Sequence, residues 1–288
     1  MEEFAYSAPT SVADAVRLLA ADGARALGGG TDLLIQLRSG ARRVRHLVDV
    51  KRIPELVRLT CDATAGLHLG AAVPCWRLGD DPTVARLYPG LTEAARLIGS
   101  TQIQSRATIG GNLCNGSPAA DTTPALIALG ARAVIEGPRG RRTLPVEDFV
   151  LAPGRTVLDA GELLVALEVP APAPLGADAY QRFIPRNEMD IAVVGVGAAI
   201  TLGAGGECTA ARVALGAVGP TPIRADAAAS TLVGSRLDAA ALGRAADAAM
   251  AAAHPITDMR APAAFRREIV GVLTKRVVAE AARRAGAR

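Results

Sequence analysis

Aromatic side chains are scarce in this sequence, and lysine is nearly absent. Phe, Trp and Tyr make up 3% of the 288 residues, although 50% of the residues are hydrophobic. The core must therefore be packed mainly from Ala, Val, Leu and Ile. Of the 32 basic residues only Lys51 and Lys275 are lysine, and the net charge is +4. No basic run is interleaved with aromatic residues, which argues against a nucleic-acid interface, whereas the small positive charge suits an anionic ligand.

Cysteines and long apolar runs are also few. The cysteines, at positions 61, 75, 114 and 208, form no C-x₂-C pair, so we expect no iron–sulfur or zinc site built by this chain alone. The longest apolar stretch, residues 191–206, is interrupted by glycine and is too short to span a bilayer. The chain opens with Glu2 and Glu3 and no apolar stretch follows, which argues against secretion. We expect a cytoplasmic protein.

Two common nucleotide-binding patterns are missing as well. No Walker A sequence occurs, and the nearest match to the Rossmann fingerprint G-x-G-x-x-G, at residues 195–200, has Ile200 in place of the third glycine. A nucleotide site in this chain must therefore be built differently.

Two other glycine-rich strings are present, at residues 26–34 (ALGGGTDLL) and 107–113 (ATIGGNL). Glycine has no Cβ and reaches positive φ freely, so such segments let backbone N–H groups encircle a phosphate. Alone, the first string also fits an ordinary strand-to-helix turn, and the second fits a β-bulge or hairpin bend. Two such strings in one domain predict a clamp that holds the diphosphate of a dinucleotide from both sides.

Polar residues accompany both strings. Asn115, Ser117 and Asp121 follow the second string and supply an amide, a hydroxyl and a carboxylate, which suits ribose and adenine contacts. The carboxylate of Asp32, in the first string, would repel a phosphate, so we assign it a capping or ribose contact instead.

The order of the predicted elements indicates two domains in an α+β chain. Ser11 can cap the first helix of a small βαβ unit. Further strands and helices are predicted, with the strands at 24–27, 46–50, 66–72, 131–136 and 163–169, and the helices at 33–37, 83–87, 91–98 and 124–129. The composition of residues 170–176 is typical of a linker. Beyond it we predict a hairpin of strands 191–201 and 211–218 and two Ala-rich helical segments, 225–252 and 262–285. The boundary is placed near residue 175, giving domains 1–175 and 176–288.

A family resemblance follows from these strings. Residues 100–121 (STQIQSRATIGGNLCNGSPAAD), with the first glycine string, resemble the FAD-binding medium subunit of the molybdenum hydroxylases, which include xanthine dehydrogenase and carbon monoxide dehydrogenase. Residues 182–194 (RFIPRNEMDIAVV) resemble the start of the family's C-terminal domain. The resemblance implies an FAD-binding domain of two α/β subdomains, as in vanillyl-alcohol oxidase and p-cresol methylhydroxylase. A C-terminal domain with a small antiparallel sheet and helices would follow it.

The resemblance also implies which residues bind FAD, without a covalent bond. One side of the diphosphate would be wrapped by Leu27, Gly28, Gly29, Gly30, Thr31, Asp32, Leu33 and Leu34, and the other by Thr108, Ile109, Gly110, Gly111 and Asn112. Ser117 and Asp121 would hold the ribose or adenine end, and Asn115 would lie near the flavin or the diphosphate. Ile98 and Leu167 match positions beside the isoalloxazine. Arg182 aligns with a family lysine at the flavin's pyrimidine edge, where a cation stabilises negative charge on the reduced ring.

The function implied is that of the flavin subunit of a heteromeric molybdenum hydroxylase. Substrate would be hydroxylated on a large subunit with the molybdopterin cofactor. Electrons would cross the [2Fe–2S] clusters of a small subunit to this FAD and then pass to an external acceptor. The partners implied are these two subunits, in a dimer of heterotrimers. The [4Fe–4S] insertion of the related 4-hydroxybenzoyl-CoA reductases is missing, because residues 112–124 are continuous and contain only Cys114.

Two alternatives remain at this point. One is a free-standing FAD-dependent reductase resembling UDP-N-acetylenolpyruvoylglucosamine reductase, which shares the fold but needs a proton donor for which the C-terminal domain offers no evident Ser/Glu pair. The other is a scaffold that has lost its flavin, which the intact glycine strings disfavour.

Overall fold

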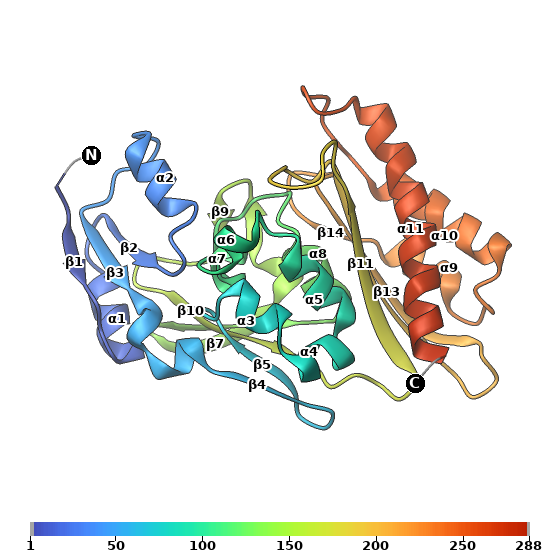
Figure 1. Cartoon of the computed structure of the whole chain (residues 1–288), viewed down its shortest axis with the longest axis horizontal. Coiled ribbons are helices and arrows are strands. Elements are labelled where there is room, and N and C mark those ends of the chain that lie inside the picture. Colours follow the sequence, from blue (N-terminus) through green and yellow to red (C-terminus); the bar gives the residue numbers. More distant parts are fainter. Residues whose placement is uncertain (1–2, 287–288) are drawn as a thin grey trace.

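The three larger β-sheets lie in succession along the long axis of the molecule (Figure 1). The structure is a computed structural model that describes residues 3–286. A parallel sheet lies at the N-terminal end, a five-stranded antiparallel sheet in the middle, and a four-stranded antiparallel sheet at the C-terminal end. The predicted α+β fold class is confirmed.

The N-terminal lobe is the predicted βαβ unit. Its strand order is β1-β3-β2, with β1 at Ala5–Ser7, β2 at Ala24–Leu27 and β3 at His46–Asp49. Helix α1 (Val12–Leu19) connects β1 to β2 and begins as predicted, because Ser11 Oγ accepts a hydrogen bond from the backbone N–H of Asp14 at 3.1 Å. Helix α2 (Leu33–Arg38) follows β2, and two 3₁₀ turns, Val50–Arg52 and Pro54–Val57, follow β3.

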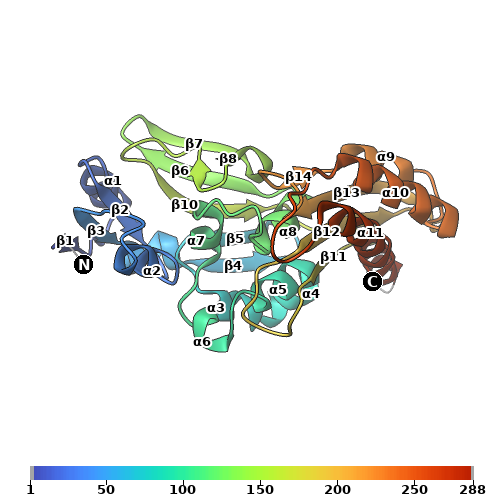
Figure 2. The same ribbon diagram turned by 90° about the horizontal axis from the view of Figure 1, so that it is seen from above.

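The middle lobe packs short helices on a five-stranded sheet of order β4-β5-β10-β6-β7 (Figure 2). Its strands are β4 (Leu59–Asp62), β5 (Gly66–Gly70), β6 (Arg132–Gly137), β7 (Gly140–Pro145) and β10 (Leu163–Val169). Its helices are α3 (Cys75–Gly79), α4 (Pro82–Leu87), α5 (Pro89–Arg96), α6 (Thr101–Gln104), α7 (Ile109–Cys114) and α8 (Thr122–Ala128). The 3₁₀ turn Val146–Asp148 and the small hairpin of β8 (Val150–Ala152) and β9 (Arg155–Thr156) complete it. Tyr88 and Phe149 are fully buried in its core.

The C-terminal lobe is a four-stranded sheet covered by helices. Its strands are β11 (Gly176–Phe183), β12 (Val194–Leu202), β13 (Cys208–Gly216) and β14 (Ile223–Arg224), and its helices are α9 (Asp226–Leu232), α10 (Ala239–Ala252) and α11 (Ala263–Gly286). Helices α5 and α8 of the middle lobe contact the same sheet. Gly197, in the near-Rossmann string, lies within β12, where a Cβ would come within 2.7 Å of the Pro124 carbonyl oxygen. This glycine therefore allows close packing between the two lobes.

The C-terminal half differs from the prediction in two places. Strand β11 was not predicted, because the linker-like residues 170–176 lead directly into it at Gly176. The helical segment predicted at 225–252 is two helices, since residues 233–238 leave the helix with positive φ at Gly234 and Leu237. Asp238 then starts α10 by accepting a hydrogen bond from the N–H of Ala241.

No helix within residues 3–286 is both long and apolar enough to cross a membrane.

Candidate cofactor site

The first glycine segment connects the end of β2 to the start of α2. Gly28 follows β2 directly, and Gly30 has a positive φ of 79°, which glycine reaches without strain. None of the hydrogen bonds within residues 3–286 uses the backbone N–H groups of residues 29–33. Consecutive amides without an acceptor are the donors that an anion needs.

Asp32 differs from one of its two predicted roles. It occupies the position before α2, but its carboxylate accepts no capping hydrogen bond, and the side chain is exposed. The predicted cap is therefore wrong. The ribose contact stays a prediction.

The second glycine segment forms the first turn of helix α7. Thr108 Oγ1 caps this turn by accepting a hydrogen bond from the backbone N–H of Gly111 at 3.0 Å. Gly110 is packed tightly, since a Cβ there would lie 2.5 Å from the carbonyl oxygen of Ala71. The β-bulge or hairpin bend considered for this string is wrong, and the segment is a capped helix start.

The two glycine segments touch each other. A Cβ on Gly29 would lie 2.1 Å from the carbonyl oxygen of Arg106, and one on Gly28 would lie 3.1 Å from Thr108 Oγ1. The amide of Gln36, in α2, donates to Asn115 Oδ1 just after α7, at 3.4 Å. Only glycine allows this contact at position 29, because any Cβ would overlap the backbone of the neighbouring segment. The two strings that the sequence pairs therefore lie in contact, and their joint binding of one diphosphate stays a prediction.

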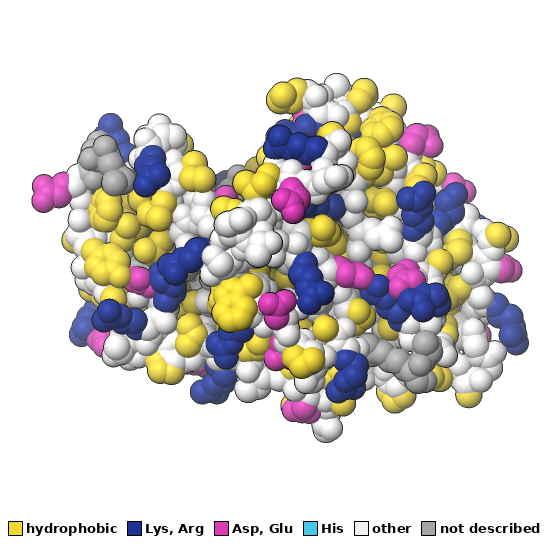
Figure 3. All heavy atoms as spheres, viewed as in Figure 1, with side chains coloured by type: hydrophobic (Ala, Val, Ile, Leu, Met, Phe, Trp, Pro, Cys, Tyr) yellow, Lys and Arg dark blue, Asp and Glu magenta, His cyan; other side chains and the backbone are white. Residues whose placement is uncertain are grey.

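This site lies at the surface between two lobes. The space-filling view shows the molecule hollowed between the lobe that carries α2 and the C-terminal lobe (Figure 3). Helices α6 and α7 lie at the base of that hollow in the ribbon view of the same face. A ligand held by both glycine segments can therefore reach toward the C-terminal lobe.

A buried polar cluster joins the middle lobe to β11. The carboxylate of Asp121 accepts hydrogen bonds from the Tyr180 hydroxyl at 2.8 Å and from Arg182 Nη1 at 2.6 Å. The Asp121 and Arg182 side chains are 8% and 4% exposed. Burial raises the pKa of Asp121 to about 6, while Arg182 and Tyr180 act in the opposite direction. The side chains predicted to lie at the ribose end (Asp121) and at the flavin (Arg182) are therefore in direct contact, and both roles stay predictions.

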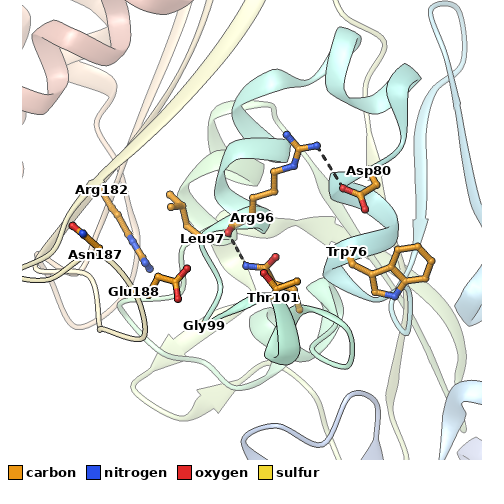
Figure 4. A pocket seen from close by; sticks show the side chains of 10 residues that line it. Trp76, Asp80, Arg96, Leu97, Gly99, Thr101, Arg182, Asn187 and Glu188 are labelled. Carbon is orange, nitrogen blue, oxygen red and sulfur yellow. Dashed lines mark hydrogen bonds and ion pairs between the residues drawn. The ribbon is translucent and has the colours of Figure 1, made fainter.

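Arg182 also reaches a pocket of about 370 Å³ between the middle lobe and the loop after β11 (Figure 4). Its Nε is buried and has no hydrogen-bond partner within the described chain. The pocket is lined by both lobes, through Trp76, Asp80, Arg96, Leu97, Gly99, Thr101, Gln104, Arg182, Asn187 and Glu188. Neighbours of Ile98 on both sides thus face the same space as Arg182. This arrangement suits the predicted position of the two residues near one ring.

The remaining predicted residues lie in different surroundings. Leu167 is fully buried in β10, paired with Leu69 and Ala133, so its side chain is part of the core. Asn112 accepts a hydrogen bond from the Thr122 hydroxyl at 2.7 Å, and Ser117 is half-buried in the turn before α8. Their contacts with FAD stay predictions.

Sequence analysis did not identify one residue that lies near the site. Lys51 Nζ donates to the carbonyl oxygen of Gly28 at 3.0 Å. The signal was present, because Lys51 directly follows the strand predicted at 46–50, and the ends of neighbouring parallel strands meet at one sheet edge. The missing step was the pairing of that strand with 24–27.

Comparison with known protein families accounts for almost the whole chain. Residues 2–172 match the family described as the FAD binding domain in molybdopterin dehydrogenase. Residues 179–281 match the CO dehydrogenase flavoprotein C-terminal domain.

Individual relatives are FAD-binding or medium subunits of such dehydrogenases. The xanthine dehydrogenase FAD-binding subunit of Escherichia coli O157:H7 is 35% identical over 289 residues, covering 99% of each chain. The carbon monoxide dehydrogenase medium chain of Hydrogenophaga pseudoflava is 36% identical, covering 96% of each chain.

Solved structures share the complete fold. A chain of the carbon monoxide dehydrogenase from Hydrogenophaga pseudoflava superposes with a TM-score of 0.93, at 36% identity and 98% coverage of each chain. A chain of quinoline 2-oxidoreductase from Pseudomonas putida 86 superposes with a TM-score of 0.90, at 32% identity, covering 99% of this chain and 98% of that one. The chain therefore belongs to the family of FAD-binding medium subunits of the molybdenum hydroxylases.

Proposed function

We propose that this chain is the flavin subunit of a heteromeric molybdenum hydroxylase. The observation that carries the proposal is the direct contact between the two glycine segments, with unused N–H groups on the first of them. When bound, FAD would accept electrons from [2Fe–2S] clusters of a partner subunit and deliver them to an external acceptor.

The residues present fit the diphosphate of FAD. The amides of residues 29–33 would donate to phosphate oxygens, and Thr108 with the start of α7 would close the other side. The absence of Cβ atoms at Gly28 and Gly29 lets the two segments approach closely enough to serve one ligand. Asp121 and Arg182 would act as one unit at the flavin end, together with Ile98, and Ser117 and Asn115 would lie along the ligand. Leu167 would support the ring only through the core that it belongs to.

The partner chains follow from the family. Relatives are named medium chains, FAD subunits or subunits of a dehydrogenase complex. By analogy this chain would bind a small [2Fe–2S] subunit and a large molybdopterin subunit, in a dimer of heterotrimers in the cytoplasm. Its free cysteines suit a reducing compartment. The domain division near residue 175 is retained, since the N-terminal and C-terminal halves have largely separate buried clusters.

The test is to purify the chain alone and together with its partners. We expect the lone chain to bind one equivalent of FAD and to show no hydroxylation of aldehydes or azaheterocycles, because molybdopterin chemistry belongs to the large subunit. The assembled complex should regain hydroxylation, with flavin reduction following substrate oxidation. A lone chain that hydroxylates at the rate of the complex, or one that binds no flavin, would overturn the proposal.

A further inference from the structure

Lys51 contacts the backbone of the first glycine segment from outside the loop. It lies in the 3₁₀ turn Val50–Arg52 that follows β3, and Asp49 at the end of β3 pairs in register with Leu27 at the end of β2. From there the ammonium group donates to the carbonyl oxygen of Gly28 at 3.0 Å and pairs with Asp49 Oδ1 at 2.8 Å. Lys51 therefore links the ends of β2 and β3 at the point where the first glycine segment begins.

The contact determines how one peptide unit is turned. In a planar trans peptide the C=O and the following N–H point in opposite directions. When Lys51 holds the carbonyl of Gly28, the N–H of Gly29 is directed away from Lys51. That N–H is the first of the consecutive donors that have no acceptor in the described chain. Glycine on both sides of this peptide would otherwise allow it to rotate freely.

Lys51 is itself held in place. Asp49 accepts hydrogen bonds from the Lys51 backbone N–H at 3.0 Å and from the Tyr6 hydroxyl at 2.8 Å. Burial raises the pKa of Asp49, but the hydrogen bonds from Lys51 and Tyr6 outweigh it and hold the pKa below its usual value. The carboxylate thus neutralises the ammonium group, so the contact with Gly28 is mainly geometric in its effect.

We propose that Lys51 is a positioning residue for the diphosphate site formed by the two glycine segments. By binding the Gly28 carbonyl oxygen it directs the Gly29 N–H toward the anion. This rests on the proposed function, because the anion is the diphosphate of FAD. Lys51 acts through the backbone, and preorganising a donor saves the cost of ordering the loop when the ligand binds.

The test uses the full chain and titration with FAD. Lys51→Met removes the donor, Lys51→Arg keeps a charged donor, and Lys275→Met is a matched control at the other lysine, which is exposed in α11. We expect the dissociation constant for FAD to rise about 10- to 100-fold in Lys51→Met, as for loss of a charge-assisted hydrogen bond. Lys51→Arg should recover most of the affinity, and Lys275→Met should behave as wild type.

The melting temperature of the flavin-free chain shows at which temperatures each variant is folded. Lys51→Met also leaves the Asp49 carboxylate without its ion pair, so we expect its melting temperature to fall, and FAD affinity is measured well below that temperature. Unchanged FAD affinity in the folded Lys51→Met chain would overturn the inference, and so would an affinity that Lys51→Arg does not restore. If the wild-type chain binds no FAD, the proposed function fails instead.

A second measurement covers the case in which Lys51→Met does not fold. The folded wild-type chain is partly acetylated and then separated into flavin-bound and flavin-free fractions, and each lysine is quantified by mass spectrometry. Acetyl-Lys51 should be depleted from the flavin-bound fraction, while acetyl-Lys275 is distributed equally. Equal distribution of both would contradict the inference.

Discussion

Replacing Gly29 by alanine tests the contact between the two glycine segments. The added Cβ would lie 2.1 Å from the carbonyl oxygen of Arg106 and 2.8 Å from Ala107 Cα. These are backbone atoms, so no side-chain rotation relieves the overlap, and the segments must separate by more than an ångström. Overpacking of this kind costs about 1–3 kcal/mol.

We expect Gly29→Ala to fold but to lose FAD. The separated segments would no longer hold one diphosphate together, so the dissociation constant should rise about 10- to 100-fold, equivalent to the loss of one or two good hydrogen bonds. The melting temperature of the flavin-free chain should fall by roughly 2–6 °C. Flavin fluorescence titration measures the first, and a thermal melt followed by circular dichroism measures the second.

Alanine variants of two other glycines serve as controls for Gly29→Ala. A Cβ at Gly28 would meet only the Thr108 side chain, with the hydroxyl oxygen at 3.1 Å, so Gly28→Ala should weaken FAD binding less. A Cβ at Gly243, within α10, would meet nothing within 4 Å, so Gly243→Ala should bind FAD normally and stabilise the helix by about 0.5–1 kcal/mol. Wild-type affinity and stability in Gly29→Ala would refute the contact itself.

Three further predictions concern other parts of the structure. Arg182→Met leaves the buried Asp121 carboxylate without its ion pair and should destabilise the chain by about 3–5 kcal/mol in urea unfolding, and a loss below about 1 kcal/mol would show that the pair is not buried as described. Thr108→Val removes the cap of α7 and should cost about 1 kcal/mol as well as FAD affinity, whereas Thr108→Ser should keep both, and equal behaviour of the two variants would count against the cap. Hydrogen bonds and charge from Arg283 and Arg284 lower the pKa of Glu280 from 4.5 to about 2, so its stabilising contribution is present above the higher value and is lost as the pH falls toward the lower one. Glu280→Gln should therefore lose less stability than wild type between those two pH values in an acid titration, and parallel curves would contradict the pairing.

Sequence analysis predicted which segments lie together better than it predicted the local structure of those segments. The pairing of two glycine strings, supported by the family resemblance, placed residues 26–34 and 107–113 together, and their contact at Gly29 agrees. The helical state of the second string was not predictable from the residues, because adjacent glycines disfavour a helix. Packing of Gly110 on Ala71 and the cap from Thr108 override that preference.

Sequence analysis failed mainly to predict contacts between segments that are far apart in the chain. The pairing of Asp121 with Arg182 joins residues 61 positions apart, on a helix start and on a strand that the sequence did not reveal. Strand β11 begins with Gly-Ala-Asp-Ala, residues of low β-propensity, and gains its order from pairing with β12 along its whole length. Lys51 was overlooked for the same reason, because its role depends on the pairing of β2 with β3.

A structure of the chain with FAD bound tests the central claim most directly. The account predicts that the diphosphate lies between the two glycine segments, within hydrogen-bond distance of the amides of residues 29–33 on one side and of the Thr108–Gly111 turn on the other. A diphosphate bound elsewhere, with those amides still lacking an acceptor, would contradict it.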